Sequence, residues 1–495
     1  PKTVAKCLSI RRERAASHNP FVPICANLWM VPVVVAVSFL WPLMMRVLAI
    51  DVGSSSVKAG YWDGRRFAAH ARAAYSTHFA GPRAEVDPAR LLSALTKAAR
   101  EACAGRGGVD VVTLGAFSTG LIVTGADGRP RTPIITHQDR PSAADALRLL
   151  TLVPQRTWLA RLGNLPYPGG IGASSLAWLH RHQPAALRKD ARVGQLSSWI
   201  ARQLTGEWVI DPSNAVFLGL CRIRDYTWDS EACAAVGIRP EALPRVVWAD
   251  EIAGRLTPAA ARRLGLSAGT PLAGGFVDTS AAVIQTPMRP GQLSHNAGST
   301  DVLALSLHRP APAEGILTRP VGVGRPDGRF AKSARWLAVR TIAAAGSATA
   351  WARSTFFSEL SDEKWSAVLR QACRAAAALP PDPTAPRCMP SFAGDRAAIP
   401  APDAFPGAAF ERITLAATRD QLLLAIVRGL LEQSRHNLAL LGQLHPLQKQ
   451  VYEMGGASDL AAAMHAAWRS RGAPRTFTRL AGDSLRGLVH LAECL

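Results

Sequence analysis

The sequence lacks the cysteine spacing of a metal-binding or disulfide-stapled protein. Its eight cysteines are scattered along the chain, and no two of them form a CxxC pair. Neither a zinc site built from cysteine pairs nor a disulfide framework is therefore indicated. A reduced, cytoplasmic setting fits this cysteine usage.

Acidic residues are also scarce, since 36 Asp and Glu stand against 57 Lys and Arg, for a formal net charge of +21. Charge of this size suggests a nucleic acid or an acidic surface as partner. The basic residues form neither a run nor a stripe, however, and Arg and Ala are abundant throughout. We therefore interpret the charge as compositional bias and predict no nucleic-acid partner. The alternative is a nucleic-acid-binding protein, which steeply salt-dependent DNA binding would reveal.

The length of 495 residues and the hydrophobic content of 48% are enough for more than one packed domain. The first part differs from the rest, because a basic stretch is followed by an apolar run, 28–45, about as long as a membrane span. Pro32 and Pro42 weaken a continuous helix in that run. We expect residues 1–44 to be a non-native or disordered upstream extension and expect no membrane partner. An apolar signal anchor is the alternative.

The stretch VLAIDVGSSSVKAGYWDGRRFAAHA, 47–71, predicts strand, polar turn, strand, Asp-Gly turn and strand. Because no helix follows the first glycine, the pattern argues against a Rossmann or Walker-type phosphate site. The stretch GQLSHNAGSTDVLALSL, 291–307, repeats the strand–turn–strand theme. Two such turns facing each other across a cleft would form a phosphate clamp, because oriented N–H groups in a tight turn bind anions.

Other segments predict helices and strands around these hairpins. Asp87 and Pro88 are typical of a helix start, and 109–117 predicts a strand. Helical patterns dominate from about 142 to 206. A long amphipathic helix is expected over 419–442, ended by Gly442.

In order along 45–495, the chain resembles the FGGY carbohydrate kinases of the actin-like/Hsp70-like ATPase superfamily. The similar segments are AIDVGSSSVKAG, GAFSTGLIVTGADGRPRTPIITHQDR, LTGEWVIDPSNA, TWDSEACAAVGIRPEALPRVV, LAGGFVDTSAAVI, NAGSTDVLAL, PSFAGDRAAIPAPDAFPGAAF, YEMGGASDLAAAMHAAW and LAGDSLRGLVHLA. The resemblance implies an α/β fold of two actin-like (ribonuclease H-like) domains, each a mixed sheet flanked by helices, with a central cleft. It implies a sugar-binding domain over 45–286 and an ATP-binding domain over 287–495.

The resemblance also implies ATP and Mg²⁺ as cofactors, with Asp51 orienting the metal. The residues that would bind ATP and its phosphates lie in the two turns, near the first turn and in the adenosine segment: Gly53, Ser54, Ser55, Ser56, Lys58, Gly298, Ser299, Thr300, Gly346, Gly455, Gly456, Ala457 and Ser458. Solvated hairpin tips are the structural alternative for the turns, and plain helix packing is the alternative for Gly346. Asp301 follows the second turn, and we expect its carboxylate to point away from the phosphates.

Asp278 is the residue expected to carry the chemistry. A carboxylate within hydrogen-bond reach can take the proton of a sugar hydroxyl as it attacks the γ-phosphate. Asp278 is also expected, with Asp51, to bind the metal. Gly274 and Gly275 would let the backbone bring it into the cleft. An ordinary helix N-cap is the alternative interpretation of Asp278.

The sugar side departs from the family pattern. Ser118, Thr119, Gly120, Asp139 and Arg140 are expected, with Asp278, to bind the substrate. His137 stands where Trp is common in the family, so it is either a substrate contact or a structural histidine. The implied reaction is ATP-dependent phosphorylation of a sugar or polyol, with a pentulose or related ketose as first expectation. An actin-like ATPase and a catalytically weak sugar-sensing relative stay open, as does a homodimer.

Overall fold

The computed structural model describes residues 45–495 except 285, 287, 323, 325–334, 379, 381, 401–406, 455–457, 470–475, 481–483 and the side chain of Phe276. Residues 44–495 form one compact unit. The expectations for 1–44 and for Gly455, Gly456 and Ala457 lie outside the described residues. None of the helices in the described part of the chain is both long enough and apolar enough to cross a membrane.

The first sheet is built around the strand that opens the described chain. Its order is β12–β13–β6–β1–β2–β3, with β14 also paired to β6. The strands are β12 (Ile252–Arg255), β13 (Pro271–Ala273), β6 (Val111–Ala116), β1 (Val47–Val52), β2 (Ser56–Trp62), β3 (Phe67–Ala74) and β14 (Phe276–Val277). Strand β1 runs antiparallel to β2 and parallel to β6. Every residue of β1 is buried, because the sheet is covered on both faces.

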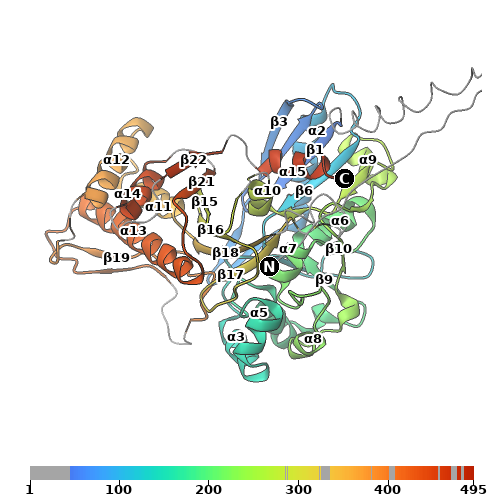
Figure 1. The fold of residues 1–495 in the computed structure, drawn as a ribbon, viewed down its shortest axis with the longest axis horizontal. Coiled ribbons are helices and arrows are strands. Elements are labelled where there is room, and N and C mark those ends of the chain that lie inside the picture. Colours follow the sequence, from blue (N-terminus) through green and yellow to red (C-terminus); the bar gives the residue numbers. More distant parts are fainter. Residues whose placement is uncertain are drawn as a thin grey trace, which may run out of the picture. The chain divides into compact units, whose positions relative to one another are not determined.

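Two helices far apart in the sequence cover these faces. On one face α2 (Pro88–Cys103) packs through Leu91 and Leu95 against Leu48 and Ile50 of β1. Asp87 caps α2, accepting a hydrogen bond from the Ala89 N–H at 2.8 Å, as the Asp-Pro pattern predicts. On the other face lies the last helix, α15 (Ser484–Ala492), beside β1 and β6 (Figure 1).

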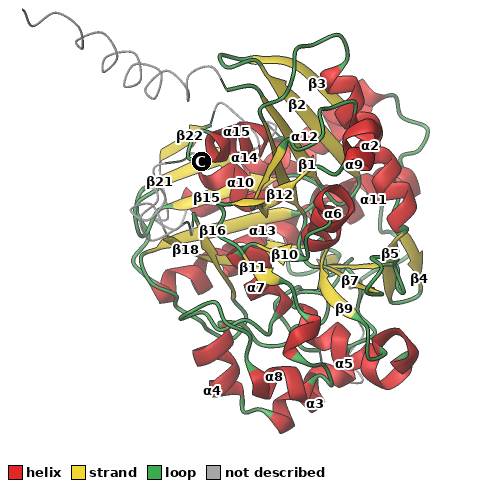
Figure 2. Cartoon of the chain, turned by 90° about the vertical axis from the view of Figure 1, so that its right-hand side faces the viewer, coloured by secondary structure: helices red, strands yellow, loops and turns green. Residues whose placement is uncertain are grey.

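The second large sheet has the order β17–β18–β16–β15–β21–β22, and several of its strands are visible side by side in Figure 2. The strands are β17 (Leu317–Val321), β18 (Arg335–Ile342), β16 (Asp301–Leu307), β15 (Leu293–Ala297), β21 (Gln450–Met454) and β22 (Thr476–Arg479). The helices that pack with this part of the chain are α11 (Gly346–Phe356), α12 (Asp362–Ala378), α13 (Arg419–Leu444) and α14 (Asp459–Arg469). The opposite face, through Leu317 and Val339, joins the core that also holds α10 (Asp278–Ile284) and α15.

The remaining elements lie mostly between β3 and β12 in the sequence. A smaller sheet has the order β4–β5–β8–β7–β9. Its strands are β4 (His78–Ala80), β5 (Arg83–Val86), β8 (Ile134–Thr136), β7 (Gly120–Thr124) and β9 (Arg192–Gln195). The helices are α3 (Ala143–Leu152), α4 (Gln155–Thr157), α5 (Gly172–His182), α6 (Leu196–Thr205), α7 (Pro212–Leu218), α8 (Ser230–Ala235) and α9 (Pro258–Leu264); the short pairs are β10 (Val209–Ile210) with β11 (Arg245–Val246) and β19 (Arg387–Met389) with β20 (Ala409–Glu411).

The expected α/β fold with two mixed sheets flanked by helices is confirmed, and two local expectations are corrected. The helical region over 142–206 is interrupted by β9, which is held by pairing with β7, a distant strand. Gly442 does not end the long helix, because α13 continues to Leu444. The residues before it, 419–441, are already helical, and a single glycine destabilises a helix too little to end it.

The close approach of α15 to α10 depends on one glycine. A Cβ at Gly487 would lie 1.6 Å from the carbonyl oxygen of Ala281 in α10. The backbone carbonyl of Ala281 cannot move aside as the end of a flexible side chain can. Only glycine therefore permits this spacing between the last helix and the helix that Asp278 begins.

We predict that Gly487→Ala destabilises the protein by about 1–3 kcal/mol or more, because the added methyl overpacks the α10–α15 contact. The matched control is Gly442→Ala in α13, where a Cβ would meet only Leu447, at 3.6 Å. That change should raise the free energy of unfolding by about 0.5–1 kcal/mol, since alanine is the better helix former. Urea titration of both variants measures the difference, and equal stabilities would contradict the prediction.

Candidate active site

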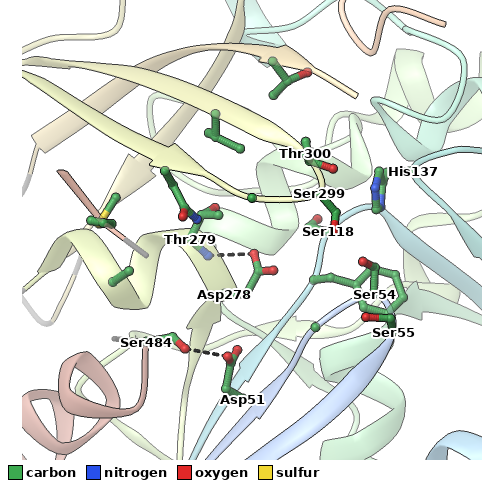
Figure 3. Close-up of a pocket in the computed structure, with 18 of the residues that line it drawn as sticks. Asp51, Ser54, Ser55, Ser118, His137, Asp278, Thr279, Ser299, Thr300 and Ser484 are labelled. Carbon is green, nitrogen blue, oxygen red and sulfur yellow. Dashed lines mark hydrogen bonds between the residues drawn. The ribbon is translucent and has the colours of Figure 1, made fainter. Parts of the chain in front are cut away.

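One cavity of about 340 Å³ gathers the residues singled out in the sequence (Figure 3). The predicted site residues on its wall are Asp51, Gly53, Ser54, Ser55, Ser56, Lys58, Ser118, Asp278, Gly298, Ser299 and Thr300. His137 lines it as well. Both glycine-serine turns and Asp278 therefore face the same space, although they come from three separate parts of the chain.

The first turn joins β1 to β2 and is held by its own backbone. The Gly53 N–H donates to the Ser56 carbonyl at 3.0 Å, and the Tyr75 N–H donates to the Ser55 carbonyl at 3.1 Å. The Tyr75 hydroxyl donates to the Gly53 carbonyl. Ser54 and Ser55 at the tip are exposed. Ser54 and Ser55 thus lie at the cavity wall, on a turn that these hydrogen bonds hold in place.

The second turn joins β15 to β16 and is braced from behind by the start of α11. The Gly346 N–H donates to the Gly298 carbonyl at 3.1 Å, and the Ala345 N–H donates to the Ser299 carbonyl at 2.9 Å. A Cβ at Gly346 would lie 2.6 Å from the Gly298 oxygen. Gly346 does not line the cavity itself; its backbone holds the turn that does.

Asp301 points away from this turn, as expected from its charge. Its Oδ1 lies 2.6 Å from His295 Nε2, and His295 Nδ1 lies 2.8 Å from His465 Nε2. His465 Nδ1 in turn lies 2.8 Å from Glu453 Oε1. The carboxylate is therefore buried in a network behind the sheet and adds no negative charge to the phosphate side of the cavity.

Asp278 enters the cavity on a sharp strand-to-helix turn. Strand β14 pairs with β6 and leads directly into α10, which Asp278 begins. The turn needs glycines, since Gly275 has φ +96° and a Cβ at Gly274 would lie 2.2 Å from the Trp248 oxygen. Asp278 Oδ1 accepts the Thr279 N–H at 2.6 Å (Figure 3). The residue thus bonds the first turn of its own helix and lines the cavity as well.

Burial and the nearby charges shift the pKa of Asp278 in opposite directions. Burial raises the pKa of the Asp278 carboxyl, while the guanidinium groups of Arg319 and Arg396 lower it. Burial likewise lowers the pKa of each of these arginines to about 10. The site therefore holds a poorly solvated carboxyl group whose pKa is raised by burial, a rise that the Thr279 N–H and the two nearby cations reduce.

Asp51 ends β1 and is only 5% exposed. Its Oδ2 accepts the Ser484 hydroxyl at 2.5 Å (Figure 3), and Lys58 Nζ lies 3.8 Å from the same oxygen. Ser484 is the first residue of α15, so the end of the chain contributes to a site built on its first strand. Sequence reasoning missed Ser484, because no local signal links residues so far apart.

The residues expected on the sugar side divide into two groups. Ser118 lines the cavity, and its carbonyl accepts Arg396 Nη2 at 2.6 Å. Thr119 donates its hydroxyl to the Gly170 carbonyl at 2.7 Å, and the Gly120 N–H donates to Gln195 Oε1 at 2.9 Å. Neither of the latter two lines the cavity.

Asp139 and Arg140 also lie off the cavity wall. Asp139 Oδ2 accepts the Ala84 N–H at 3.0 Å, and Arg140 donates to the carbonyls of His137 and Ala393, each at 2.8 Å. Their observed contacts tie loops together around the wall. Burial lowers the pKa of His137 well below its usual value, so this wall residue is a neutral imidazole.

Two arginines on the wall were also missed. Arg396 lies in the segment PSFAGDRAAIPAPDAFPGAAF, whose resemblance to the family did not by itself point to this residue. Arg319 lies in β17, where every residue is buried. A charged residue inside a buried strand is a signal that could have identified it, because arginine is rarely buried without a partner. Ser458, by contrast, is exposed and accepts the Ala461 N–H at 3.0 Å at the start of α14.

Comparison with known proteins agrees with this geometry. Residues 46–285 match the model of the FGGY family of carbohydrate kinases, N-terminal domain. The chain is 30% identical over 275 residues to a xylulose kinase of Streptomyces rubiginosus, covering 55% of this chain and 56% of the relative. It is 32% identical over 272 residues to a glycerol kinase of Aromatoleum aromaticum, covering 52% and 53%. The chain thus spans about half the length of these curated relatives.

Solved structures share the fold over a larger part of the chain. A xylulose kinase from Rhodospirillum rubrum has a TM-score of 0.74 at 22% identity, covering 90% of this chain and 89% of that one. A gluconate kinase from Lactobacillus acidophilus has a TM-score of 0.73 at 17% identity, covering 91% and 88%. With this match, residues 46–285 of the chain belong to the FGGY family of carbohydrate kinases, as their N-terminal domain.

Proposed function

We propose that the protein is a kinase that transfers the γ-phosphoryl group of ATP to a hydroxyl group of a sugar or polyol. The observation that carries this proposal is the shared cavity of two glycine-serine turns and the buried carboxylate of Asp278. Phosphoryl transfer needs donors that hold the phosphates and a base that receives the acceptor proton. The family and its relatives named as xylulose kinase and glycerol kinase support the same reaction class.

In this proposal the two turns hold the phosphates. Ser54, Ser55 and Ser299 supply hydroxyl groups, the turn backbones supply N–H groups, and glycine allows close approach. Residues 45–286 would bind the sugar and 287–495 most of the ATP, with Gly455, Gly456, Ala457 and Ser458 near the adenosine. Helix α15, near the C-terminal end of the sequence, packs against β1 and β6 of the first sheet.

The carboxylates suit a magnesium ion. Mg²⁺ uses few carboxylates and keeps several waters or phosphate oxygens, and Asp51 and Asp278 both line the cavity. Within the described ranges no group of three or more His, Cys, Asp or Glu forms a metal cluster, which fits a cation held largely by ATP. Asp51 and Asp278 would hold the ion, which when bound neutralises phosphate charge.

Asp278 would act as the base. Its carboxylate would accept the hydroxyl proton of the acceptor as that oxygen attacks the γ-phosphorus. Burial makes the carboxylate a stronger base, and Arg319 and Arg396 limit the rise of its pKa. The acceptor would lie near Ser118 and the neutral His137, and a ketose such as a pentulose is the finer proposal. The experiments below distinguish this kinase from an ATPase that needs no acceptor and from a sugar sensor without turnover.

The first test replaces the base. Asp278→Asn should lower turnover by about 10²–10⁴-fold, because the amide cannot accept the proton. ATP affinity should change little, since the turns are untouched. Coupled ADP release with pentuloses, hexuloses, glycerol and tetritols measures turnover, and calorimetry measures ATP binding. Near-normal turnover in the variant would remove the mechanism, and ADP release that no acceptor stimulates would indicate an ATPase.

The pH profile gives a second test. Because the pKa of Asp278 is raised, its carboxylate becomes protonated at a higher pH than an ordinary aspartate, whose pKa is about 3.9. The base is active only when ionised, so kcat/KM should fall as pH decreases, and the fall should begin at a higher pH than for an ordinary aspartate of pKa ~3.9. Circular dichroism at each pH separates this effect from unfolding. A flat profile down to that pH in folded protein would contradict the assignment.

The third test disturbs the second turn through Gly346, whose backbone N–H supports the turn on the side away from the cavity. Gly346→Ala should weaken ATP binding by about tenfold or more, because its Cβ would collide with the Gly298 carbonyl at 2.6 Å. The control is Ser347→Ala, an exposed neighbour whose backbone N–H to the Ser299 carbonyl is retained. Calorimetry with an ATP analogue compares the two variants. Unchanged affinity in Gly346→Ala would show that this turn does not hold the phosphates.

A further inference from the structure

Arg319 is a buried cation inside a strand. It lies in the middle of β17, pairs with Leu337 of β18, and is 3% exposed. Its side chain lines the cavity, with its guanidinium carbon 5.6 Å from the ring centre of Phe217 in α7. The residue therefore presents a positive charge to the ligand space and not to solvent.

The guanidinium has unused hydrogen-bonding capacity. Its Nε and Nη2 have no hydrogen-bond partner among the residues that the structure describes. These two nitrogens form one edge of the guanidinium plane, the edge that binds two oxygens of a carboxylate or phosphate side by side. Burial lowers the pKa of Arg319 to about 10, with Asp278 as its opposing charge. A buried cation in this state destabilises the free protein unless a ligand supplies the missing anion.

The sheet register separates Arg319 from the phosphate turn that joins β15 to β16. Arg319 pairs with Leu337, which pairs with Ser306, five residues beyond Asp301. Five residues of strand span about 16 Å. The cavity wall between the two ends carries the apolar side chains of Leu317, Val302 and Val339. An anion bound by Arg319 would therefore lie at the end of the cavity away from this turn, which is where we place the acceptor.

A second arginine strengthens the positive charge at that end. Arg396 is 9% exposed and lines the same cavity; its Nη2 bonds the Ser118 carbonyl, while its Nε has no partner among described residues. Asp278 is the carboxylate that offsets both arginines. Asp395 acts on Arg396 as well, whereas Asp278 is the carboxylate that opposes the charge of Arg319.

We propose that the acceptor is an anionic sugar whose carboxylate or phosphate group binds the Nε–Nη2 edge of Arg319. This inference rests on the proposed kinase activity, and it replaces the neutral ketose named above as the acceptor with an anionic sugar. The acceptor would lie with its oxyanion on Arg319 and its reacting hydroxyl at Asp278. A neutral ketose would leave the cation unpaired, so it would be a poorer acceptor than its acid counterpart.

The experiment compares matched acceptors by ADP release. The probes are four- to six-carbon sugar acids, sugar phosphates of the same lengths, and neutral ketoses and polyols. The wild type should prefer one anionic series by about 100-fold or more in kcat/KM, and Arg319→Met should lower kcat/KM for that series by a much larger factor than for neutral acceptors, which removes the preference. Whether acids or phosphates are preferred identifies the source of the oxyanion.

A stability measurement separates a binding role from a structural one. Arg319→Met should raise the thermal midpoint of the ligand-free protein, because an apolar side chain replaces an unpaired buried cation. The preferred anion should raise the midpoint of the wild type and not that of the variant. Thr318→Val, on the opposite face of β17 and with its hydroxyl also unpartnered, is the matched control and should leave acceptor preference unchanged.

The outcomes are distinguishable. A lower midpoint in Arg319→Met together with an equal loss of activity on all acceptors would overturn the inference. A neutral acceptor preferred by the wild type would overturn it as well, but would leave the kinase proposal standing if its release of ADP required Asp278. No acceptor-dependent ADP release in the wild type would overturn both.

Discussion

The contact of α15 with α10 and β1 is the packing constraint on which the site depends. Gly487 lets the last helix approach the Ala281 carbonyl of α10, whose first residue is Asp278. The first residue of α15, Ser484, donates its hydroxyl to Asp51 at the end of β1. One helix from the end of the chain therefore fixes the elements that carry both carboxylates. A looser helix would separate them, since backbone spacing in this core leaves no room for adjustment.

The charged side chains of the cavity only partly neutralise one another. Arg319 and Arg396 oppose the rise that burial causes in the pKa of Asp278, yet neither arginine has all its hydrogen-bond donors satisfied by the described residues. Such a site is unfavourable when empty and gains most when oppositely charged groups enter it. The proposed phosphates, cation and anionic acceptor would each neutralise a charge that the fold leaves exposed to the cavity.

The two phosphate turns have different supports. The first is held by Tyr75 through the carbonyls of Gly53 and Ser55, whereas the second is held by the N–H groups at the start of α11. The carboxylate of Asp301, which would repel phosphate, is turned toward His295 behind the sheet. Each turn is thus supported on the side away from the cavity, and its serine residues Ser54, Ser55 and Ser299 line the cavity.

The sequence alone determined what local chemistry can determine: the two hairpins, the capped start of α2 and the glycine-serine turns, because strand alternation, glycine and capping act over a few residues. Asp278 was singled out by the family resemblance, since its local pattern alone fits a helix N-cap equally well. The extent of α13 and the position of β9 needed packing partners. Only the tertiary structure brought Ser484 to Asp51, moved Thr119, Asp139 and Arg140 off the cavity wall, and exposed the unpaired edge of Arg319. These depend on contacts between distant segments, and whether a buried polar group has a partner is a property of the folded chain.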